Sequence, residues 1–278
     1  MTHTPPVTDA HVGEFERLAL EATGVRLSSG ARNRVPDALT RAMDAQRVTD
    51  PDRLLARLRE PGVGLQLTSH IVGELTTKET YLFRDPHQFD CLADTLLPQL
   101  RASLEPIGPT LRVWSAGCAT GEEAYSIAML LANAGITQAV VLGTDLSDEA
   151  IERARTGVAT EMRLAPDAQR YAPLVRRCIR DSDAGPIIAE NVRLMVRFAV
   201  HNILRDPVPA GQHLILCRNV MIYMPAAEQR MLVGALWRAL APGGLLLLGE
   251  AELLHVMKHD FERAPCESAI IYRRPKST

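Results

Sequence analysis

The sequence lacks the features of a membrane or secreted protein. No apolar stretch approaches the roughly 20 residues that a membrane-spanning helix requires, and the first residues show no leader pattern of basic and then apolar residues. The net charge of -2 provides no basic excess for binding nucleic acid. These absences predict a globular cytoplasmic protein that neither inserts into a membrane nor uses nucleic acid as its main partner.

Patterns for metal binding and for a disulfide framework are also missing. The five cysteines are scattered and include no Cys-x-x-Cys pair, and the eight histidines include no His-Glu-x-x-His motif. We therefore expect no metal site, and we expect all five cysteines to be free thiols in a reducing compartment.

The most informative segment that is present is a small-residue loop between a predicted strand and a predicted helix. Residues 111–114 are apolar like a buried strand, and Gly117 and Gly121 permit tight turns before a helical pattern begins. A phosphate-binding loop would need a motif such as Gly-Lys-Ser/Thr, whereas this loop ends in Glu122 and Glu123, which would repel a pyrophosphate. The loop therefore predicts a cationic ligand. The alternative is that the two glutamates only stabilise the helix N-terminus through the helix dipole.

A further acidic residue follows at the end of the next predicted strand. Residues 140–145 end in Asp145, about 20 residues beyond the loop, the spacing at which a doubly wound sheet presents a carboxylate to ribose hydroxyls. S-adenosylmethionine fits because it has an ammonium group, a sulfonium group and a ribose. We predict that Glu123 faces its methionine or ribose part and that Asp145 faces the ribose hydroxyls.

More polar residues are predicted at the ends of later strands. Residues 196–204 are typical of a third strand that delivers Asn202, and residues 214–223 of a fourth that delivers Asn219 and Tyr223. Further strands are predicted at residues 240–249, with a Pro-Gly turn, and at residues 268–273. Because parallel strands end at one edge of a sheet, these side chains should meet there.

Four blocks of the sequence carry a resemblance to a known family. They are residues 75–84 (Leu-Thr-Thr-Lys-Glu-Thr-Tyr-Leu-Phe-Arg), the loop at 113–123, residues 217–223 (Cys-Arg-Asn-Val-Met-Ile-Tyr) and residues 242–244 (Pro-Gly-Gly). In this order and spacing, the chain resembles the CheR-type chemotaxis receptor glutamate methyltransferases from about residue 12 to residue 274. The resemblance implies an α/β fold, namely a class I Rossmann-like S-adenosylmethionine-dependent methyltransferase domain with a seven-stranded doubly wound sheet. It also implies an N-terminal all-helical domain and a small β insertion.

This resemblance and the local patterns predict how the chain is divided. We expect a helical docking domain at residues 10–84, an S-adenosylmethionine-binding methyltransferase domain at 85–278, and a β-subdomain inserted within it at 158–198. Helices are expected at residues 12–23, 32–46 and 51–58, then two more before Arg84 and one at 86–104. Strand-like segments at 174–180 and 192–198 enclose a turn at 181–185. The insertion is either a docking point for a receptor tail peptide, by strand addition, or a lid over the cofactor.

The resemblance implies a set of site residues as well. Arg84 and Tyr223 are the predicted catalytic residues, since Arg84 can hold the acceptor carboxylate and Tyr223 can orient it. The predicted cofactor-binding residues are Lys78, Thr80, Arg84, Gly117, Glu123, Asp145, Asn202, Ile203, Asn219 and Val220. Lys78 and Leu82 stand where members of the family commonly have asparagine and phenylalanine. Residues 250–251 replace a His-Ser pair, so only Glu252 keeps that motif.

The implied activity is methyl transfer from S-adenosylmethionine to glutamate side chains of chemotaxis receptors, the methyl-accepting chemotaxis proteins. The products are glutamate methyl esters, used in sensory adaptation, and S-adenosylhomocysteine. A monomer would bind the cytoplasmic helical region of the receptors, with the receptor C-terminal tail as a second contact. In the helical domain, the arginines that could face this acidic partner are Arg32, Arg34, Arg41 and Arg47, unless that domain serves only in packing. Two other functions stay open: a cofactor-binding regulator with little catalysis, and a small-molecule O-methyltransferase.

Overall fold

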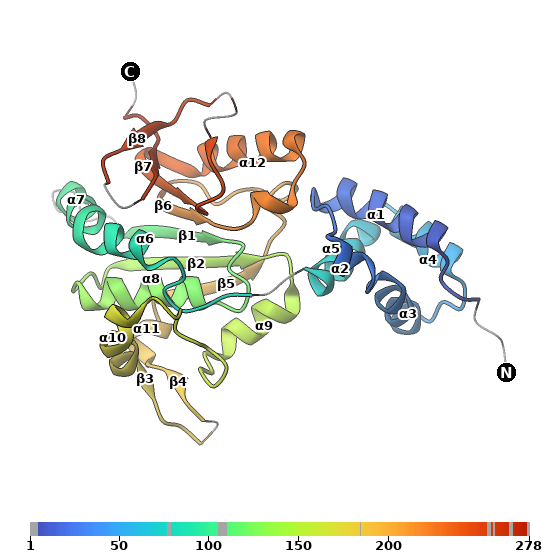
Figure 1. Cartoon of the computed structure of the whole chain (residues 1–278), viewed down its shortest axis with the longest axis horizontal. Helices are drawn as coiled ribbons and strands as arrows, with labels where there is room; N and C mark the ends of the chain where they lie inside the picture. The colour runs from blue at the N-terminus through green and yellow to red at the C-terminus, as the bar shows by residue number, and fades with distance from the viewer. Residues whose placement is uncertain are drawn as a thin grey trace.

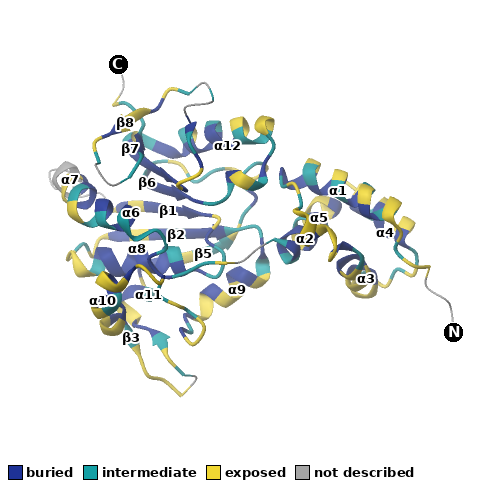
Figure 2. Cartoon of the chain, viewed as in Figure 1, coloured by how far each residue is buried: buried dark blue, intermediate teal, exposed yellow. Residues whose placement is uncertain are grey.

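The chain forms a small helical domain and a larger α/β domain in a computed structural model (Figure 1). The structure describes residues 5–76, 79–104 (101–104 without side chains), 110–183, 185–254, 257, 259–266 and 269–276. Buried residues gather in the strands and on the inward sides of the helices, while the outer helical faces are exposed (Figure 2). Each domain therefore has a core of its own.

The helical domain packs five helices within residues 5–76. They are α1 (Asp9–Thr23), α2 (Ser29–Arg32), α3 (Val35–Gln46), α4 (Pro51–Leu58) and α5 (Val63–Leu75). Asp50 and Pro51 start α4 as expected, because the Asp50 carboxylate accepts a hydrogen bond from the first turn and proline suits the first helical position. Phe15, Leu54 and Ile71 are buried together in one apolar cluster. This cluster joins helices that are distant in sequence.

One expectation for this region is wrong. The two helices expected between residue 58 and Arg84 are a single helix, α5, and Thr76 after it is already extended. Leu82 then pairs with Leu164 of the α/β domain, and Phe83 stacks on Tyr171 with ring centroids 4.1 Å apart. The apolar residues before Arg84 thus pack against the larger domain and do not form another helix.

The α/β domain is built on a seven-stranded sheet with the order β5-β2-β1-β6-β7-β9-β8. The strands are β1 (Leu111–Ala116), β2 (Ala139–Asp145), β5 (Val196–Val200), β6 (Gln212–Cys217), β7 (Leu240–Leu248), β8 (Glu262–Ala264) and β9 (Ile271–Arg273). The first five in this order are parallel, and β9 and β8 are antiparallel to their neighbours. The expected doubly wound sheet is confirmed.

Both faces of the sheet are covered by helices. Val113 of β1 packs in the same cluster as α8 (Glu122–Asn133), whereas its neighbour Trp114 packs with α12 (Ala226–Ala239). Successive side chains of a strand point to opposite faces, so a strand with apolar residues at both positions is buried on both sides. Outside the insertion, this domain also has α6 (Pro86–Cys91), η1 (Leu92–Leu96), α7 (Leu97–Leu104), α9 (Asp148–Thr156) and the short η3 (Met221–Tyr223).

The insertion contains less strand than expected. It holds η2 (Gln169–Tyr171), α10 (Ala172–Cys178), β3 (Ile179–Arg180), β4 (Ile187–Ile188) and α11 (Glu190–Arg193). The strand expected at 174–180 is mostly α10, because Leu174, Val175 and Cys178 bury one helical face. The strand expected at 192–198 begins only at Val196. Short apolar runs broken by arginines do not distinguish a helix from a strand.

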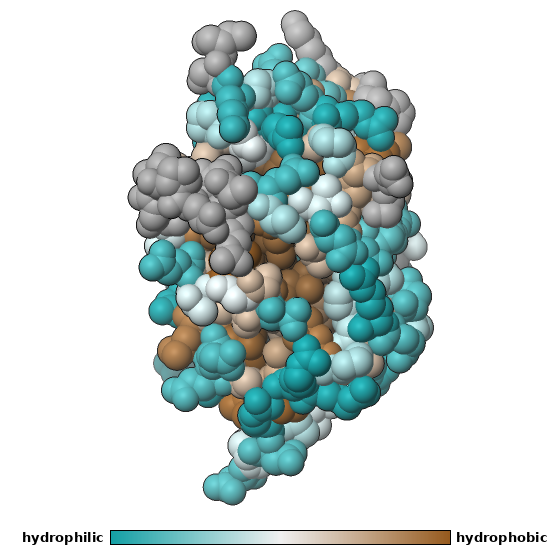
Figure 3. Space-filling view, turned by 90° about the vertical axis from the view of Figure 1, so that its left-hand side faces the viewer, coloured by the Kyte–Doolittle hydropathy of each residue, from teal (hydrophilic) through white to brown (hydrophobic). Residues whose placement is uncertain are grey.

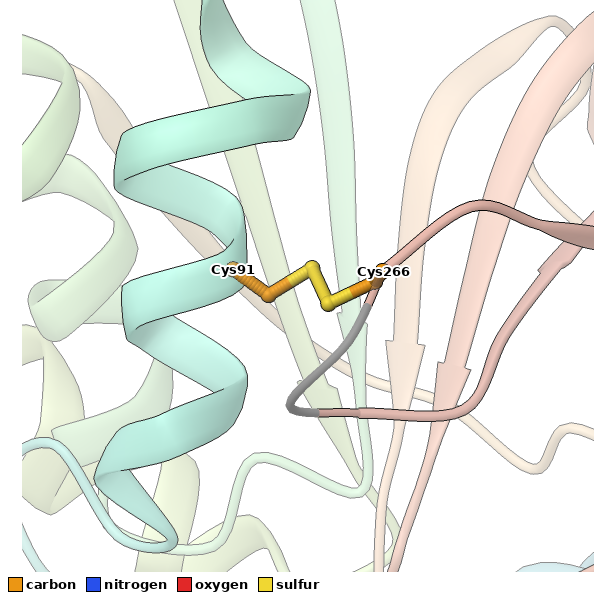
Figure 4. The surroundings of a disulfide bond; sticks show 2 residues. All are labelled: Cys91 and Cys266. Atoms are coloured by element: carbon orange, nitrogen blue, oxygen red, sulfur yellow. A yellow bond between two sulfur atoms is a disulfide. The ribbon is translucent and has the colours of Figure 1, made fainter.

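The expectation of five free thiols is also wrong. Cys91 of α6 is bonded to Cys266, which follows β8 (Figure 4). The two residues are 175 positions apart in sequence, but the fold brings their Cα atoms to 6.3 Å, a separation that a disulfide can span. Cys118, Cys178 and Cys217 are free and buried.

The face of the α/β domain that lies away from the helical domain shows apolar side chains between hydrophilic ones (Figure 3). Leu97, Leu130 and Leu174 line a cavity between α7, α8 and α10.

No helix in the described part of the chain is long and apolar enough to cross a membrane.

Candidate functional site

The predicted site residues come together at the carboxyl edge of the parallel strands. A cavity there encloses about 1300 Å³, including its open mouth. Its lining includes the predicted residues Thr80, Arg84, Gly117, Glu123, Asp145, Asn202, Ile203, Asn219, Val220 and Tyr223. Lys78 lies outside the described residues. The residues predicted at the ends of the parallel strands thus share one cavity.

The loop after β1 is shaped by unusual backbone conformations. Gly117 has φ 80°, and a Cβ atom added there would lie 2.5 Å from a side-chain methyl of Val220. Ala119 in the same loop has φ 45°. The Asp145 carboxylate accepts hydrogen bonds from the backbone N–H groups of Ala119 (2.8 Å) and Ser147 (2.9 Å). Asp145 therefore also fixes the loop that forms this wall of the cavity.

The two glutamates at the start of α8 occupy different environments. Glu123 lines the cavity and accepts hydrogen bonds from Ser115 Oγ (2.6 Å) and Arg218 Nη1 (3.1 Å). Burial raises the pKa of Glu123, although Arg218 acts to lower it. Glu122 is not part of the described cavity lining and accepts a hydrogen bond from Thr120 Oγ1. The helix-dipole alternative thus fits Glu122, whereas Glu123 can meet a cationic ligand.

Arg218 is a site residue that the sequence analysis missed. Its side chain is only 2% exposed, and its guanidinium carbon lies 5.5 Å from the Phe89 ring centroid. While Nη1 bonds to Glu123, Nη2 donates to the Asp85 carboxylate and to the Arg84 backbone oxygen (2.7 Å). The sequence feature that could have identified Arg218 is its place in the Cys-Arg-Asn-Val block. An arginine after a strand, however, is usually exposed at the surface.

Glu252, the residue that keeps its motif in the sequence, has a structural role in the site. It is 3% exposed and accepts hydrogen bonds from the backbone N–H groups of Asn219 (2.7 Å), Ile222 (3.2 Å) and Gly249 (2.8 Å). Asn219 has φ 58°, which non-glycine residues seldom adopt. Glu252 therefore holds the turn that presents Asn219, Val220 and Tyr223 to the cavity.

The two predicted catalytic residues have polar groups left for a ligand. Arg84 is partly buried, and its Nη1 donates to the Glu79 backbone oxygen at 3.1 Å. The Tyr223 hydroxyl has no hydrogen-bond partner among the described residues, while its backbone oxygen accepts from Arg26 at 2.8 Å. Both residues line the cavity.

The helical domain closes one side of the cavity. Thr23 and Val25, which follow α1, are part of the lining. The Asn202 side chain donates to the backbone oxygen of Ala22 at 3.0 Å and accepts from the backbone of Leu204 at 3.2 Å. Asn202 therefore joins the two domains at the cavity, and its expected contact with the cofactor stays a prediction.

The sheet has five parallel strands and helices on both faces, and the loop after β1 leads to the partly buried carboxylate of Glu123. Together with the family match, these features define the class: a Rossmann-like S-adenosylmethionine-dependent methyltransferase. Within this class, the chain belongs to the CheR methyltransferase family, because residues 78–270 match the family described as "CheR methyltransferase, SAM binding domain".

Similar proteins extend over nearly the whole chain. A "Chemotaxis protein methyltransferase" of Vibrio parahaemolyticus is 30% identical over 96% of this chain and 98% of its own length. A "Chemotaxis protein methyltransferase 1" of Pseudomonas aeruginosa is 32% identical over 94% of this chain and 96% of its own. A "Probable biofilm formation methyltransferase WspC" of the same species is 32% identical over 94% of this chain and 61% of its own. The protein is a methyltransferase enzyme.

Proposed function

We propose that this enzyme methylates glutamate side chains of chemotaxis receptors in the cytoplasm, with S-adenosylmethionine as the methyl donor. The names of the Vibrio and Pseudomonas relatives support the receptor substrate. The observation that carries the proposal is the arrangement of charge in one cavity. Glu123 lies in the first turn of α8 and Asp145 at the end of β2, and Arg84 and Tyr223 line the same cavity. Such a cavity has acidic groups for a cationic cofactor and a cation for an acidic acceptor.

The residues present fit the cofactor. The partly buried carboxylate of Glu123 suits its ammonium group, and Asp145 suits its ribose hydroxyls. When bound, S-adenosylmethionine supplies an electrophilic methyl group on a positively charged sulfur. Gly117 has no side chain, so a ligand can approach its backbone closely, and a Cβ atom there would collide with Val220.

The reaction requires orientation more than proton transfer, because a glutamate carboxylate is already a nucleophile. We propose that Arg84 holds this carboxylate with its planar guanidinium and that the Tyr223 hydroxyl orients it. Alignment of reactants contributes about 7–11 kcal/mol in well-oriented systems. Exclusion of water from the cavity helps further, since opposite charges are neutralised during the transfer.

The helical domain is proposed to dock the receptor helices. Three of the four arginines assigned to this role already have partners within the domain: Arg32 pairs with Glu16, and Arg34 donates to the Leu75 backbone oxygen. The third, Arg41, pairs with Glu74 at 2.9 Å. To bind a receptor, these three arginines would have to contact it in addition to their present partners or in place of them. The Arg47 side chain has no such partner in the described part of the chain, and so supports docking most directly.

The β3–β4 hairpin is proposed to bind a receptor tail peptide. It extends from the α/β domain (Figure 1), and none of its described residues lines the cavity. This position supports strand addition over the alternative of a lid. The hairpin is a sheet of two strands, and Ile187 of β4 also pairs with Val158, so the outer edge of β3 is the one proposed to accept the peptide strand.

The decisive experiment is transfer of radiolabelled methyl groups to receptor-rich membranes. We expect label on the receptor band that is released by mild base, because carboxyl methyl esters are base-labile. Membranes from cells without chemotaxis receptors are the control. Cofactor binding without base-labile label would instead support the cofactor-binding regulator, and label in small molecules alone would support the O-methyltransferase.

A further inference from the structure

Arg218 links the two halves of the cavity. One terminal nitrogen contacts Glu123 of α8, on the side assigned to the cofactor. The other contacts Asp85 and the backbone oxygen of Arg84, on the side assigned to the acceptor. Because the side chain is almost completely buried, water cannot replace these contacts.

We propose that Arg218 is a positioning residue that serves both halves of the site, keeping Glu123 charged toward the cofactor and holding Arg84 in place toward the acceptor. This inference rests on the proposed function. Arg218 would act through Glu123 and Arg84, and no direct role in the methyl transfer is assigned to it.

The first half of this role follows from the charges that face Glu123. Ser115 of β1 donates a hydrogen bond to it, Asp85 before α6 is a second negative charge, and Arg218 after β6 is the cation. Burial is the largest cause of the raised Glu123 pKa, and Asp85 acts in the same direction. Without Arg218, only the hydrogen bond from Ser115 would oppose these two effects. Glu123 would then stay protonated to a higher pH and lose its attraction for an ammonium group.

The second half follows from the backbone on each side of Arg84. Phe83 has φ 56° and Asp85 has φ 55°, conformations that side-chain-bearing residues rarely adopt and that surrounding contacts must maintain. The Phe83 N–H is held by Ser126 Oγ at 2.9 Å, and Arg218 binds the next two residues. Arg218 therefore fixes the point from which the Arg84 side chain extends.

Two substitutions separate these roles. Arg218→Gln removes the positive charge, whereas Arg218→Lys keeps a charge but cannot reach Glu123 and Asp85 through two separate nitrogens. A matched control is Arg274→Gln. Arg274 also stacks on an aromatic ring, that of Trp237, and donates to backbone oxygens, but it has no carboxylate partner among the described residues.

The first measurement is the affinity for S-adenosylhomocysteine by calorimetry between about pH 6 and 8.5, with melting temperatures for every variant. For Arg218→Gln we expect affinity about 10–100 times weaker than wild type near neutral pH, recovering as the pH rises. Arg218→Lys should stay within about threefold of wild type, and Arg274→Gln should match wild type. Glu123→Gln should bind weakly without this pH dependence, and it serves as the test if Arg218→Gln does not fold.

The second measurement is single-turnover methylation with saturating cofactor. Arg218→Lys should be slower by about tenfold or more, because Arg84 loses its tether. A wild-type pH profile in Arg218→Gln, or strong pH dependence in Glu123→Gln, would overturn the first role. Wild-type turnover in Arg218→Lys would overturn the second. Failure of the wild-type protein to bind S-adenosylhomocysteine or to methylate receptors would instead refute the proposed function.

Discussion

The two domains both contain ion pairs between arginine and acidic side chains, but the pairs differ in how far they are exposed to water. In the helical domain, Arg41 pairs with Glu74 while its side chain remains 60% exposed. In the α/β domain, Arg218 pairs with Glu123 and Asp85 at 2% exposure. Water screens the first kind of pair, so it contributes little to stability and its arginine can exchange partners. A buried network has no such freedom, because a charge that loses its partner there remains desolvated.

The comparison distinguishes arginines suited to binding a partner from an arginine suited to the catalytic site. Exposed arginines suit a surface that meets an acidic partner reversibly, whereas a buried arginine suits a site whose geometry must not change. The domains meet where Asn202 and Arg205 donate to the Ala22 backbone oxygen at the end of α1. If the helical domain docks the receptor as proposed, this junction lies beside the cavity of the other domain.

The strongest test of the comparison removes the helical domain. Deleting residues 1–70 should abolish receptor methylation, because it removes the proposed docking surface together with Thr23 and Val25 of the cavity lining. Circular dichroism and thermal melting must show that the remainder is folded. A folded truncation that methylates receptors at the full rate would contradict docking through this domain.

Within the α/β domain, Arg84→Lys should have the next largest effect. Turnover should fall by about 100-fold, the range for losing an oriented hydrogen-bond donor at the reacting group, while cofactor affinity changes little. The rival interpretation is that Arg84 only braces the structure through the Glu79 backbone. Melting temperature, cofactor affinity and single-turnover rate on the same sample distinguish the two, since bracing alone predicts a lower melting temperature with normal turnover.

Asp145→Ala tests the cofactor side of the cavity. We expect cofactor affinity to weaken by about 1.5–3 kcal/mol, or about 10–150-fold, and S-adenosylhomocysteine to be affected similarly. Part of this loss would come from the loop at Ala119, whose N–H loses its acceptor. Titration calorimetry with both ligands is the measurement, and unchanged binding would remove Asp145 from the site.

Glu252→Gln tests whether buried acceptors hold the site. Glutamine has nearly the same shape, but its NH₂ group would face a backbone N–H, so we expect a loss of about 1–3 kcal/mol in the free energy of unfolding. Glu250→Gln is the matched control, because the Glu250 side chain is 58% exposed and pairs with His87. Equal stabilities for the two variants in chemical denaturation would be evidence against the role of Glu252.

The smallest effect on stability is expected in the helical domain. Arg41→Ala should change the free energy of unfolding by less than about 1 kcal/mol, because the pair with Glu74 is exposed. If Arg41 takes part in docking, the KM for receptor membranes should rise by up to about fivefold and depend on salt. A stable variant with unchanged KM would assign Arg41 to packing alone.

Much of the fold could be predicted because its signals are local. The strand at residues 111–114, the glycine loop and Asp145 at the end of the next strand each follow from a few neighbouring residues and a fixed spacing. Errors arose where the signal was short. The sequence predicts a strand at residues 174–180, yet their apolar residues also match one face of a helix, and burial beside the rest of the insertion favours α10.

The sequence alone determined which residues lie at the sheet edge, since strand period and loop chemistry are properties of contiguous segments. It identified the acidic loop, several of the residues that line the cavity, and the family. Only the tertiary structure decided the partners across the chain: the contacts of Arg218 with Glu123 and Asp85, and the disulfide of Cys91 with Cys266. These contacts depend on how helices and strands pack, and a single sequence carries no local pattern that records separations of 95 to 175 residues.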